Sequence, residues 1–256
     1  MLVLVAVIAA GERLGIRPFP AISRMGRRAL PWIRAYVVAA PLTFLYLLVI
    51  ATTSWVLGSS GGRIDEALLR GHSSNLSALA QDPIRGLVQS AFWVEGLTMF
   101  LIAVALGVAL APVERWLGSA RWLAVFALGH VGASLLVAAA IWTAIDSGRA
   151  PPGLRQVVDV GASYGFAAVA GVAAHRLPRR LGLVYAVGVL VVLAGVLAVD
   201  RSFTDLGHVM AFAIGLACAP LTRSPAVGTR RRDHLIPRPT PPAVPRAVID
   251  DGAPLA

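Results

Sequence analysis

The sequence predicts an all-α membrane protein with six transmembrane helices and both termini in the cytoplasm. Three observations support this fold class. Hydrophobic residues occupy 57% of the 256 positions and charged residues only 14%, so the chain is far more apolar than a soluble domain. The apolar residues form blocks of about 20 residues, the length that a helix needs to cross a hydrocarbon core roughly 30 Å thick. Arginines lie beside alternate blocks, as basic residues do around membrane spans.

The N-terminal segment, residues 1–31, is basic and is expected in the cytoplasm. Its opening stretch, MLVLVAVIAA, is too short to span a bilayer. It also lacks the basic residues that precede the apolar core of a signal peptide. The stretch is either an interfacial segment or an artefact of start-codon choice.

The membrane domain is predicted over residues 32–222. Each predicted span is an apolar block of transmembrane length. The six spans are 32–57, 92–113, 122–145, 157–174, 181–199 and 203–221. The longest outer loop contains IDEALLRG and NLSALAQDPIRGLVQS, which predict short amphipathic helices at the membrane interface.

Basic residues orient the spans. Arginines precede the first span and follow the second, fourth and sixth, all on one predicted side: Arg13, Arg17, Arg24, Arg27, Arg28, Arg34, Arg115, Arg121, Arg176, Arg179, Arg180, Arg223 and Arg230 to Arg232. The loops on the opposite side are mixed or acidic and contain Asp65, Glu66, Asp82, Asp146, Asp200 and Asp205. Both termini are therefore expected in the cytoplasm.

The C-terminal segment, residues 223–256, contains seven prolines and few large apolar residues. This composition predicts a disordered, Pro/Arg-rich cytoplasmic tail. Its proline-rich run could bind a partner, but a solvated tail is the simpler interpretation.

Charge and cysteine content exclude several function classes. The net charge is +10, and all 23 basic residues are arginine, a usage that indicates a GC-rich bacterial genome. Topology explains these arginines, so nucleic acid is not an expected partner. The single cysteine, Cys218, excludes an internal disulfide and a Cys-based zinc site. Because no HExxH-like spacing occurs, neither a metal nor a cofactor is expected.

Ionisable side chains inside a bilayer are costly, by about 2.5 kcal/mol or more at its centre, so each one is a functional candidate. The predicted spans contain His130, His208, Asp159, Asp205 and Glu95. Glu95 is expected to reach the outer interface. His130 either makes an interhelical hydrogen bond or lines an inner cavity.

A serine and a histidine are predicted to lie at the same depth. Ser163 stands in a GxSxG pattern with Gly161 and Gly165. With spans four and six running inward at about 1.5 Å per residue, Ser163 lies about 9 Å and His208 about 8 Å below the outer boundary. A histidine can take the serine proton when the two heavy atoms lie within about 3 Å. The nucleophile elbow of an α/β-hydrolase is rejected because six helical spans leave no sheet to hold it.

Two stripes of small residues would allow the fourth and sixth spans to approach closely. They are Ser163, Ala167 and Gly171 on the fourth span, and Gly207, Ala211 and Gly215 on the sixth. Such stripes also serve packing alone, so they permit catalysis without indicating it.

The segments GASYG and DLGHVMAFAIG together resemble the rhomboid family of intramembrane serine proteases. Gly161 and Ser163 match the family's GxSG motif, and His208, Ala211 and Gly215 follow its HxxGxxxG pattern. VERWLGSARW, residues 113–122, is similar to the family's segment between helices two and three. The resemblance covers residues 32–221 and implies a six-helix bundle. It also implies that Ser163 attacks a peptide carbonyl and that His208 is general base and acid, without a third carboxylate.

The chain departs from the family pattern at its oxyanion donors. Thr98 and Ile102 stand where the family has histidine and asparagine on the second helix, and Tyr164 replaces the glycine after the serine. The loop before Phe92 also lacks the family's Trp-Arg pair. Loss of one oxyanion donor typically costs about 100-fold to 1000-fold in turnover. Backbone N–H groups of Ser163, Thr98 or Tyr164 are the candidate replacements, and the chain is most similar to divergent bacterial rhomboid-like proteins.

Two aspartates are candidate supporting residues. Asp159 shares a helical face with Ser163, and Asp205 shares one with His208. They either tune the histidine and gate water, or simply cap helix starts, where carboxylates are favoured. A metal held by His208 and both aspartates is a weaker alternative.

The sequence thus leads to two functional hypotheses. The first is a rhomboid-like intramembrane serine protease with a Ser163–His208 dyad, in the bacterial plasma membrane, that cleaves transmembrane proteins. The alternative is a catalytically inactive rhomboid-like protein that binds membrane partners. In both cases the lipid bilayer and other transmembrane proteins are the expected partners.

Overall fold

The computed structural model describes residues 19–60, 69, 71–156, 160–223 and 227. Within these ranges every regular element is a helix. The chain divides into two compact units, Met1–Tyr36 with Ile236–Ala256, and Val37–Leu235. The first unit includes most of α2 (Phe19–Val38), and the second contains the remaining helices.

Four helices are long and apolar enough to cross a membrane. They are α3 (Pro41–Ser60), α7 (Gly96–Leu117), α8 (Ser119–Asp146) and α10 (Arg179–Asp200). The protein is therefore a multi-pass integral membrane protein. The other two predicted spans correspond to shorter helices, α9 (Ser163–Ala173) and α11 (Phe203–Ala217). At about 1.5 Å per residue α9 is only about 16 Å long.

The first span begins later than predicted, because the helix is interrupted at Ala39 and Ala40. Proline disfavours helical backbone in the residue before it and is well suited to the first helical position, and α3 begins at Pro41. Residues 32–38, which the hydropathy pattern assigned to the span, belong instead to α2.

The fourth span also differs from its predicted form. Residues 160–162 are not helical, and α9 begins at Ser163 itself. The backbone turns at Gly161, whose φ of +130° is a conformation that other residues rarely adopt. The serine therefore lies on the first turn of a helix, after a tight turn, and not midway along a continuous span.

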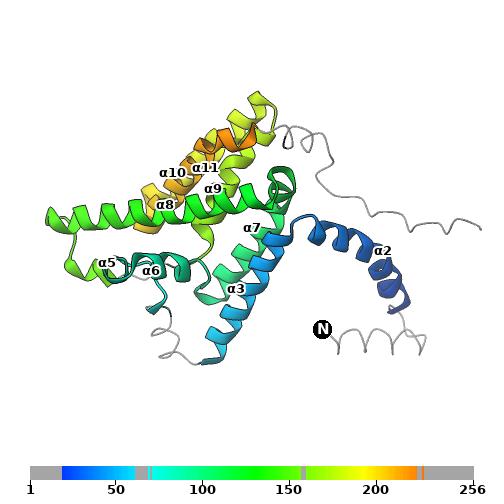
Figure 1. Ribbon diagram of the computed structural model, residues 1–256, viewed down its shortest axis with the longest axis horizontal. Helices are drawn as coiled ribbons and strands as arrows, with labels where there is room; N and C mark the ends of the chain where they lie inside the picture. Colours follow the sequence, from blue (N-terminus) through cyan, green and yellow to red (C-terminus); the bar gives the residue numbers. More distant parts are fainter. Residues whose placement is uncertain (1–18, 61–68, 70, 157–159, 224–226, 228–256) are drawn as a thin grey trace, which may run out of the picture. The chain divides into compact units, whose positions relative to one another are not determined.

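The centre of the second unit is formed by α8, α9 and α11, which lie side by side (Figure 1). Glycines allow this contact. A Cβ on Gly215 would collide with the Ala168 carbonyl, and one on Gly171 would lie 3.0 Å from the Leu216 nitrogen. Both glycines belong to the predicted small-residue stripes, so these positions do lie where α9 meets α11.

Two short helices precede α7. They are α5 (Leu76–Gln81) and α6 (Pro83–Ser90), and they fall in the loop where short helices were predicted. Asn75 caps α5 by accepting from the Ala78 N–H, and Asp82 caps α6 by accepting from the Arg85 N–H. A short 3-10 helix, η1 (Pro152–Gln156), follows α8.

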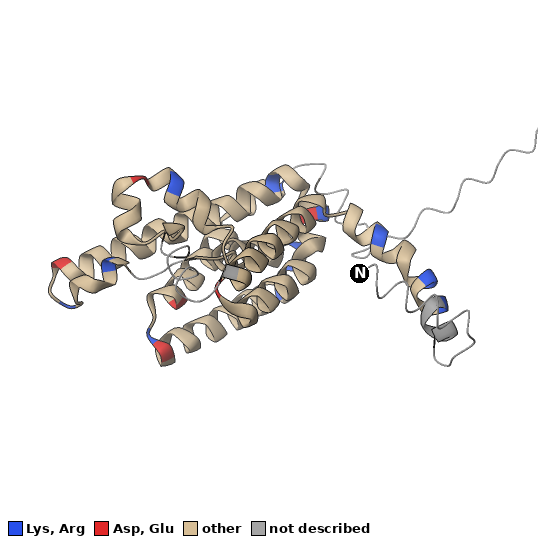
Figure 2. Ribbon diagram, turned by 90° about the horizontal axis from the view of Figure 1, so that it is seen from below, with Lys and Arg blue, Asp and Glu red and all other residues tan. Residues whose placement is uncertain are grey.

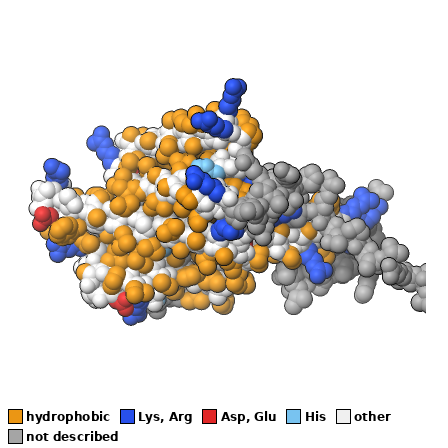
Figure 3. Space-filling model, turned by 45° about the horizontal axis from the view of Figure 1, so that its top comes forward, with side chains coloured by type: hydrophobic (Ala, Val, Ile, Leu, Met, Phe, Trp, Pro, Cys, Tyr) orange, Lys and Arg blue, Asp and Glu red, His pale blue; other side chains and the backbone are white. Residues whose placement is uncertain are grey.

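The surface of the helical body agrees with a lipid environment. Many large apolar side chains of α10 are exposed, among them Val184 and Val191, 69% and 65% exposed. Figure 3 shows apolar side chains over most of the visible face, among a smaller number of charged side chains. The cost of exposing so much apolar surface to water makes a bilayer the natural solvent for this face.

Candidate active site

Ser163 is the first residue of α9 and is partly exposed, whereas the following residues Tyr164, Gly165 and Phe166 are buried. The cap residue is Ala162, and it provides no side-chain cap within the described part of the chain. The first amide groups of a helix have no intrahelical acceptor and carry the positive end of its dipole. Ser163 thus lies at the end of α9 that favours negative charge.

The turn before Ser163 is held by α6. The Gly161 N–H donates to the carbonyl of Ser90, the last residue of α6, over 2.8 Å. A Cβ placed on Gly161 would lie 3.9 Å from the Trp93 carbonyl oxygen and 4.0 Å from the Ser163 hydroxyl. The segment that follows α6 therefore lies directly against the serine turn.

This segment is anchored in turn by α3 and α8. The Tyr46 hydroxyl donates to the Ala91 carbonyl, and the Thr53 hydroxyl donates to the Phe92 carbonyl over 2.6 Å. On the other side, His130 Nε2 lies 2.9 Å from the Leu87 carbonyl oxygen. Helices far apart in sequence thus converge on one backbone segment beside the candidate nucleophile.

The hydrogen-bond interpretation of His130 is confirmed. A carbonyl can only accept, so Nε2 carries the proton and donates to Leu87 of α6. The Ser90 hydroxyl lies 3.2 Å from the same nitrogen, and His130 is only 4% exposed. The side chain therefore links α8 to the helix that holds Gly161.

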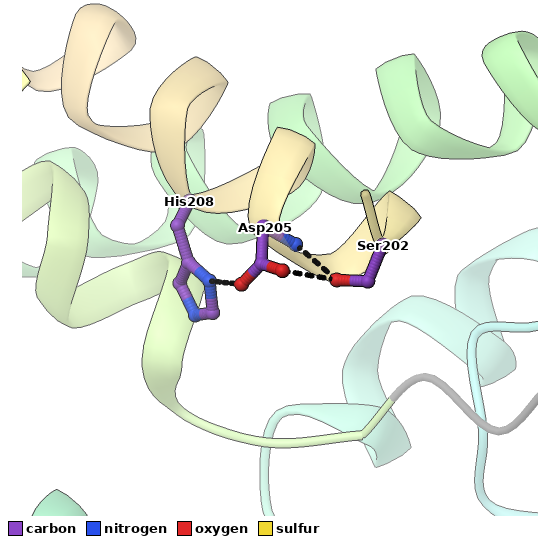
Figure 4. A network of polar contacts seen from close by, with 3 residues as sticks. All are labelled: Ser202, Asp205 and His208. Carbon is purple, nitrogen blue, oxygen red and sulfur yellow. Dashed lines mark hydrogen bonds and ion pairs between the residues drawn. The ribbon is translucent and has the colours of Figure 1, made fainter. Parts of the chain in front are cut away.

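His208 belongs to a polar network at the start of α11 (Figure 4). The Ser202 hydroxyl caps this helix by accepting from the Asp205 N–H over 3.0 Å, and it donates to Asp205 Oδ2 over 2.5 Å. The other carboxylate oxygen, Oδ1, lies 3.9 Å from His208 Nδ1. Asp205 therefore takes part in the helix cap and also neighbours the imidazole.

This arrangement has a chemical consequence for the imidazole. A carboxylate next to Nδ1 favours the tautomer with its proton on that nitrogen. The lone pair is then on Nε2, where a general base needs it. The His208 and Asp205 side chains are 25% and 17% exposed, so the pair reaches the surface of the helical body.

Tyr164 connects α9 with His208. Its ring meets the imidazole edge to face, with centroids 5.2 Å apart. Gly207 makes room for this ring, since a Cβ there would collide with it. Tyr164 directly follows Ser163. His208 therefore contacts the neighbour of Ser163 in the chain.

The structure does not bring all of the predicted site residues into contact with one another. Among the described residues, no hydrogen bond connects the Ser163 hydroxyl with His208. Thr98 is exposed in the first turn of α7, and Ile102, one turn later, is 47% exposed. Asp159 lies outside the described residues.

Sequence reasoning missed two contributors to the site. Ser90 acts through its backbone carbonyl, which any residue would provide, so no sequence signal could have indicated it. Ser202 stands three residues before Asp205, an arrangement that resembles the capping box of a helix start, and this spacing could have revealed its role.

Comparison with known proteins identifies the family. The family model described as rhomboid-like protein matches residues 35–227, which covers most of the chain and all of α3 to α11. Neither curated proteins nor solved structures gave a match. The match extends across both the GASYG turn and the His208 helix, and the chain belongs to the rhomboid-like family.

Proposed function

We propose that this protein is an intramembrane serine protease of the bacterial plasma membrane that cleaves transmembrane proteins. Ser163 is the nucleophile, and His208 is the general base and then the acid. The observation that carries the proposal is the position of Ser163 at the amino end of α9, where Tyr164 contacts His208 and Asp205 faces Nδ1.

The reaction follows from these positions. His208 Nε2 takes the serine proton as Oγ attacks a peptide carbonyl, and the resulting imidazolium is stabilised by Asp205. The imidazolium then protonates the leaving amine, and water hydrolyses the acyl-enzyme by the same steps in reverse roles. Hydrogen bonds of a catalytic pair often tighten only when substrate binds, so the proposal requires Ser163 and His208 to close their contact at that stage.

The amino end of α9 provides the oxyanion donors in this proposal. The donors are the backbone N–H groups of Ser163 and Gly165 in the first turn of α9, where the helix dipole favours negative charge. In this proposal these backbone donors replace the side chains of histidine and asparagine that stabilise the oxyanion in other rhomboids. It also assigns no role to the side chain of Thr98, whose exposure on α7 favours contact with lipid.

Covalent labelling in detergent or liposomes tests the proposal. A fluorophosphonate probe should label the wild type, whereas Ser163→Ala should abolish labelling and His208→Ala should lower its rate by about 100-fold or more. Ser147→Ala is the matched control, since this exposed serine at the end of α8 lies outside the site. Equal labelling of wild type and Ser163→Ala would remove the proposal.

The second candidate function is a pseudoprotease that binds membrane partners through the same helices. It is favoured by the missing hydrogen bond between Ser163 and His208 in the described structure, and by Ile102 at the place of an oxyanion donor. In this case a deletion strain should be rescued equally by wild type, Ser163→Ala and His208→Ala proteins. Loss of rescue by correctly folded variants would contradict binding as the sole function.

A further inference from the structure

The helix α2 (Phe19–Val38) differs in character from every membrane span of this chain. It contains four arginines and no acidic residue (Figure 2). At about 100° per residue, Arg24, Arg27, Arg28 and Arg34 fall within an arc of about 120°. The opposite arc of about 160° contains Met25, Ala29, Leu30, Trp32, Ile33, Tyr36 and Val37. The helix is therefore strongly amphipathic, with a wide apolar face opposite a face that contains all four arginines.

The apolar face is exposed along its length. Met25 is 68% exposed, Leu30 63%, Ile33 57% and Trp32 46%. A contiguous apolar surface of this kind is unfavourable in water and marks a site of interaction. The four arginines give α2 a net positive charge, which a negatively charged surface attracts.

The chain places this helix next to a bilayer. α2 ends at Val38 and the transmembrane helix α3 begins at Pro41. Three residue steps reach at most about 11 Å, so the carboxyl end of α2 cannot leave the membrane boundary. The start of α3 is itself fixed, because the Glu114 carboxylate accepts from the Leu42 and Thr43 N–H groups over 3.0 Å and 2.8 Å.

Insertion of α2 across the bilayer is opposed by its charges. Each arginine at the centre of a transmembrane helix costs about 2.5 to 3.5 kcal/mol, and α2 has four. A position in the plane of the interface satisfies both faces, because apolar side chains enter the acyl region while arginines stay among the headgroups. Trp32 and Tyr36 are of the residue types enriched at this depth.

We propose that α2 is an anionic-lipid-binding helix that lies in the interface of the bilayer crossed by α3. Its apolar face enters the boundary of the acyl chains, and its four arginines bind the phosphate groups of anionic phospholipids. The other conceivable occupant of the apolar face, a second copy of the chain, would bring two sets of arginines together. This inference does not depend on catalysis by Ser163.

Site-directed spin labelling of the full chain in vesicles tests the proposal. Single cysteines are introduced in a Cys218→Ala background at Ile33, on the apolar face, and at Ala35, on the polar side. In vesicles that contain phosphatidylglycerol, the label at Ile33 should collide more with oxygen than with a water-soluble nickel chelate. The label at Ala35 should show the reverse preference.

Lipid charge and arginine variants complete the test. In pure phosphatidylcholine the preference at Ile33 should fall. Arg28→Gln and Arg34→Gln should each lower the equilibrium constant for interfacial binding of α2 about fivefold, since a basic residue near an anionic surface contributes about 1 kcal/mol. Arg223→Gln is the matched control, because this exposed arginine lies outside α2. Access of nickel to Ile33 in anionic vesicles, protection from both reagents, or equal depth in both lipids would overturn the proposal.

Discussion

At the scale of single residues, the candidate site is an asymmetric arrangement around one imidazole. Asp205 is fixed by Ser202 and faces Nδ1 of His208, while Tyr164 covers the ring from the side of α9. Each of these contacts constrains the orientation of a histidine that would otherwise rotate freely. The sequence predicted Ser163 and His208 at similar depth and Asp205 on the same helical face as His208, but the ring contact depends on how α9 and α11 pack.

Replacement of Asp205 by asparagine measures the contribution of this carboxylate. The pair is partly exposed and its atoms are 3.9 Å apart, so its energy should lie at the level of exposed ion pairs, up to about 1 kcal/mol. Asp205→Asn should therefore slow fluorophosphonate labelling by no more than about fivefold. Thr204→Asn, an exposed neighbour on the same turn, should leave the rate unchanged. A loss as large as that of His208→Ala would instead make Asp205 an essential member of the site.

At the scale of elements, the site depends on the close approach of α9 and α11 and on the backbone segment that follows α6. Hydropathy correctly located four apolar helices, but it placed the starts of the first and fourth spans too early. The start of α3 depends on Glu114, about 70 residues away, and the start of α9 depends on the φ angle of Gly161. Neither effect is visible in a window of apolar residues.

The contact between α9 and α11 can be tested by replacing one glycine at the contact, and one glycine away from it, with alanine. Gly215→Ala should lower the thermal unfolding midpoint, because its Cβ would collide with the Ala168 carbonyl and force the backbones apart, at a cost of about 1 to 3 kcal/mol. Gly195→Ala in α10 is the control, since nothing lies within 4 Å of its Cβ. This control should be neutral or slightly stabilising, as expected for alanine within a helix. Equal effects of the two changes would contradict the close approach.

The link from α8 to the serine turn can be tested at His130. His130→Ala removes the bond from α8 to the Leu87 carbonyl, which then keeps the Ser90 hydroxyl of α6 as a donor, and loss of this buried histidine costs about 1 to 3 kcal/mol. Amide hydrogen exchange should accelerate in α6 and at Gly161, by about 5-fold to 100-fold. Ser134→Ala, one turn along α8, should not change exchange, because its buried hydroxyl has no partner among the described residues. Unchanged amide exchange at Gly161 in His130→Ala would show that His130 does not stabilise the turn before Ser163.

At the scale of the whole molecule, one buried carboxylate joins three membrane helices. Glu114 is 1% exposed on α7, and it accepts from two N–H groups of α3 and from the Ser119 hydroxyl of α8 over 2.6 Å. Gly118, with φ of +85°, makes the sharp turn that allows α8 to start beside it. Family resemblance drew attention to VERWLGSARW, but only the structure reveals that its glutamate caps another helix.

Loss of this carboxylate should destabilise the helical body. Glu114→Ala leaves three donors without their acceptor, one of them buried and two partly buried, and bonds to charged groups are each worth about 1.5 to 3 kcal/mol. The unfolding midpoint in detergent should fall by several degrees or more, and Glu114→Gln should retain part of the stability. Glu95→Gln is the control, because this exposed residue at the other end of α7 makes no side-chain cap bond in the described structure. A midpoint equal to that of the wild type would refute the capping role.

The connection between α10 and α11 consists of Arg201 and Ser202 alone, and Arg201 adopts a left-handed backbone with φ of +51°. A connection of two residues leaves little slack between the two helices. A sideways movement of α10 would therefore also move Ser202, whose hydroxyl donates to the Asp205 carboxylate next to His208. A partner helix that packs against α10 and displaces it would therefore also displace the side chains around His208.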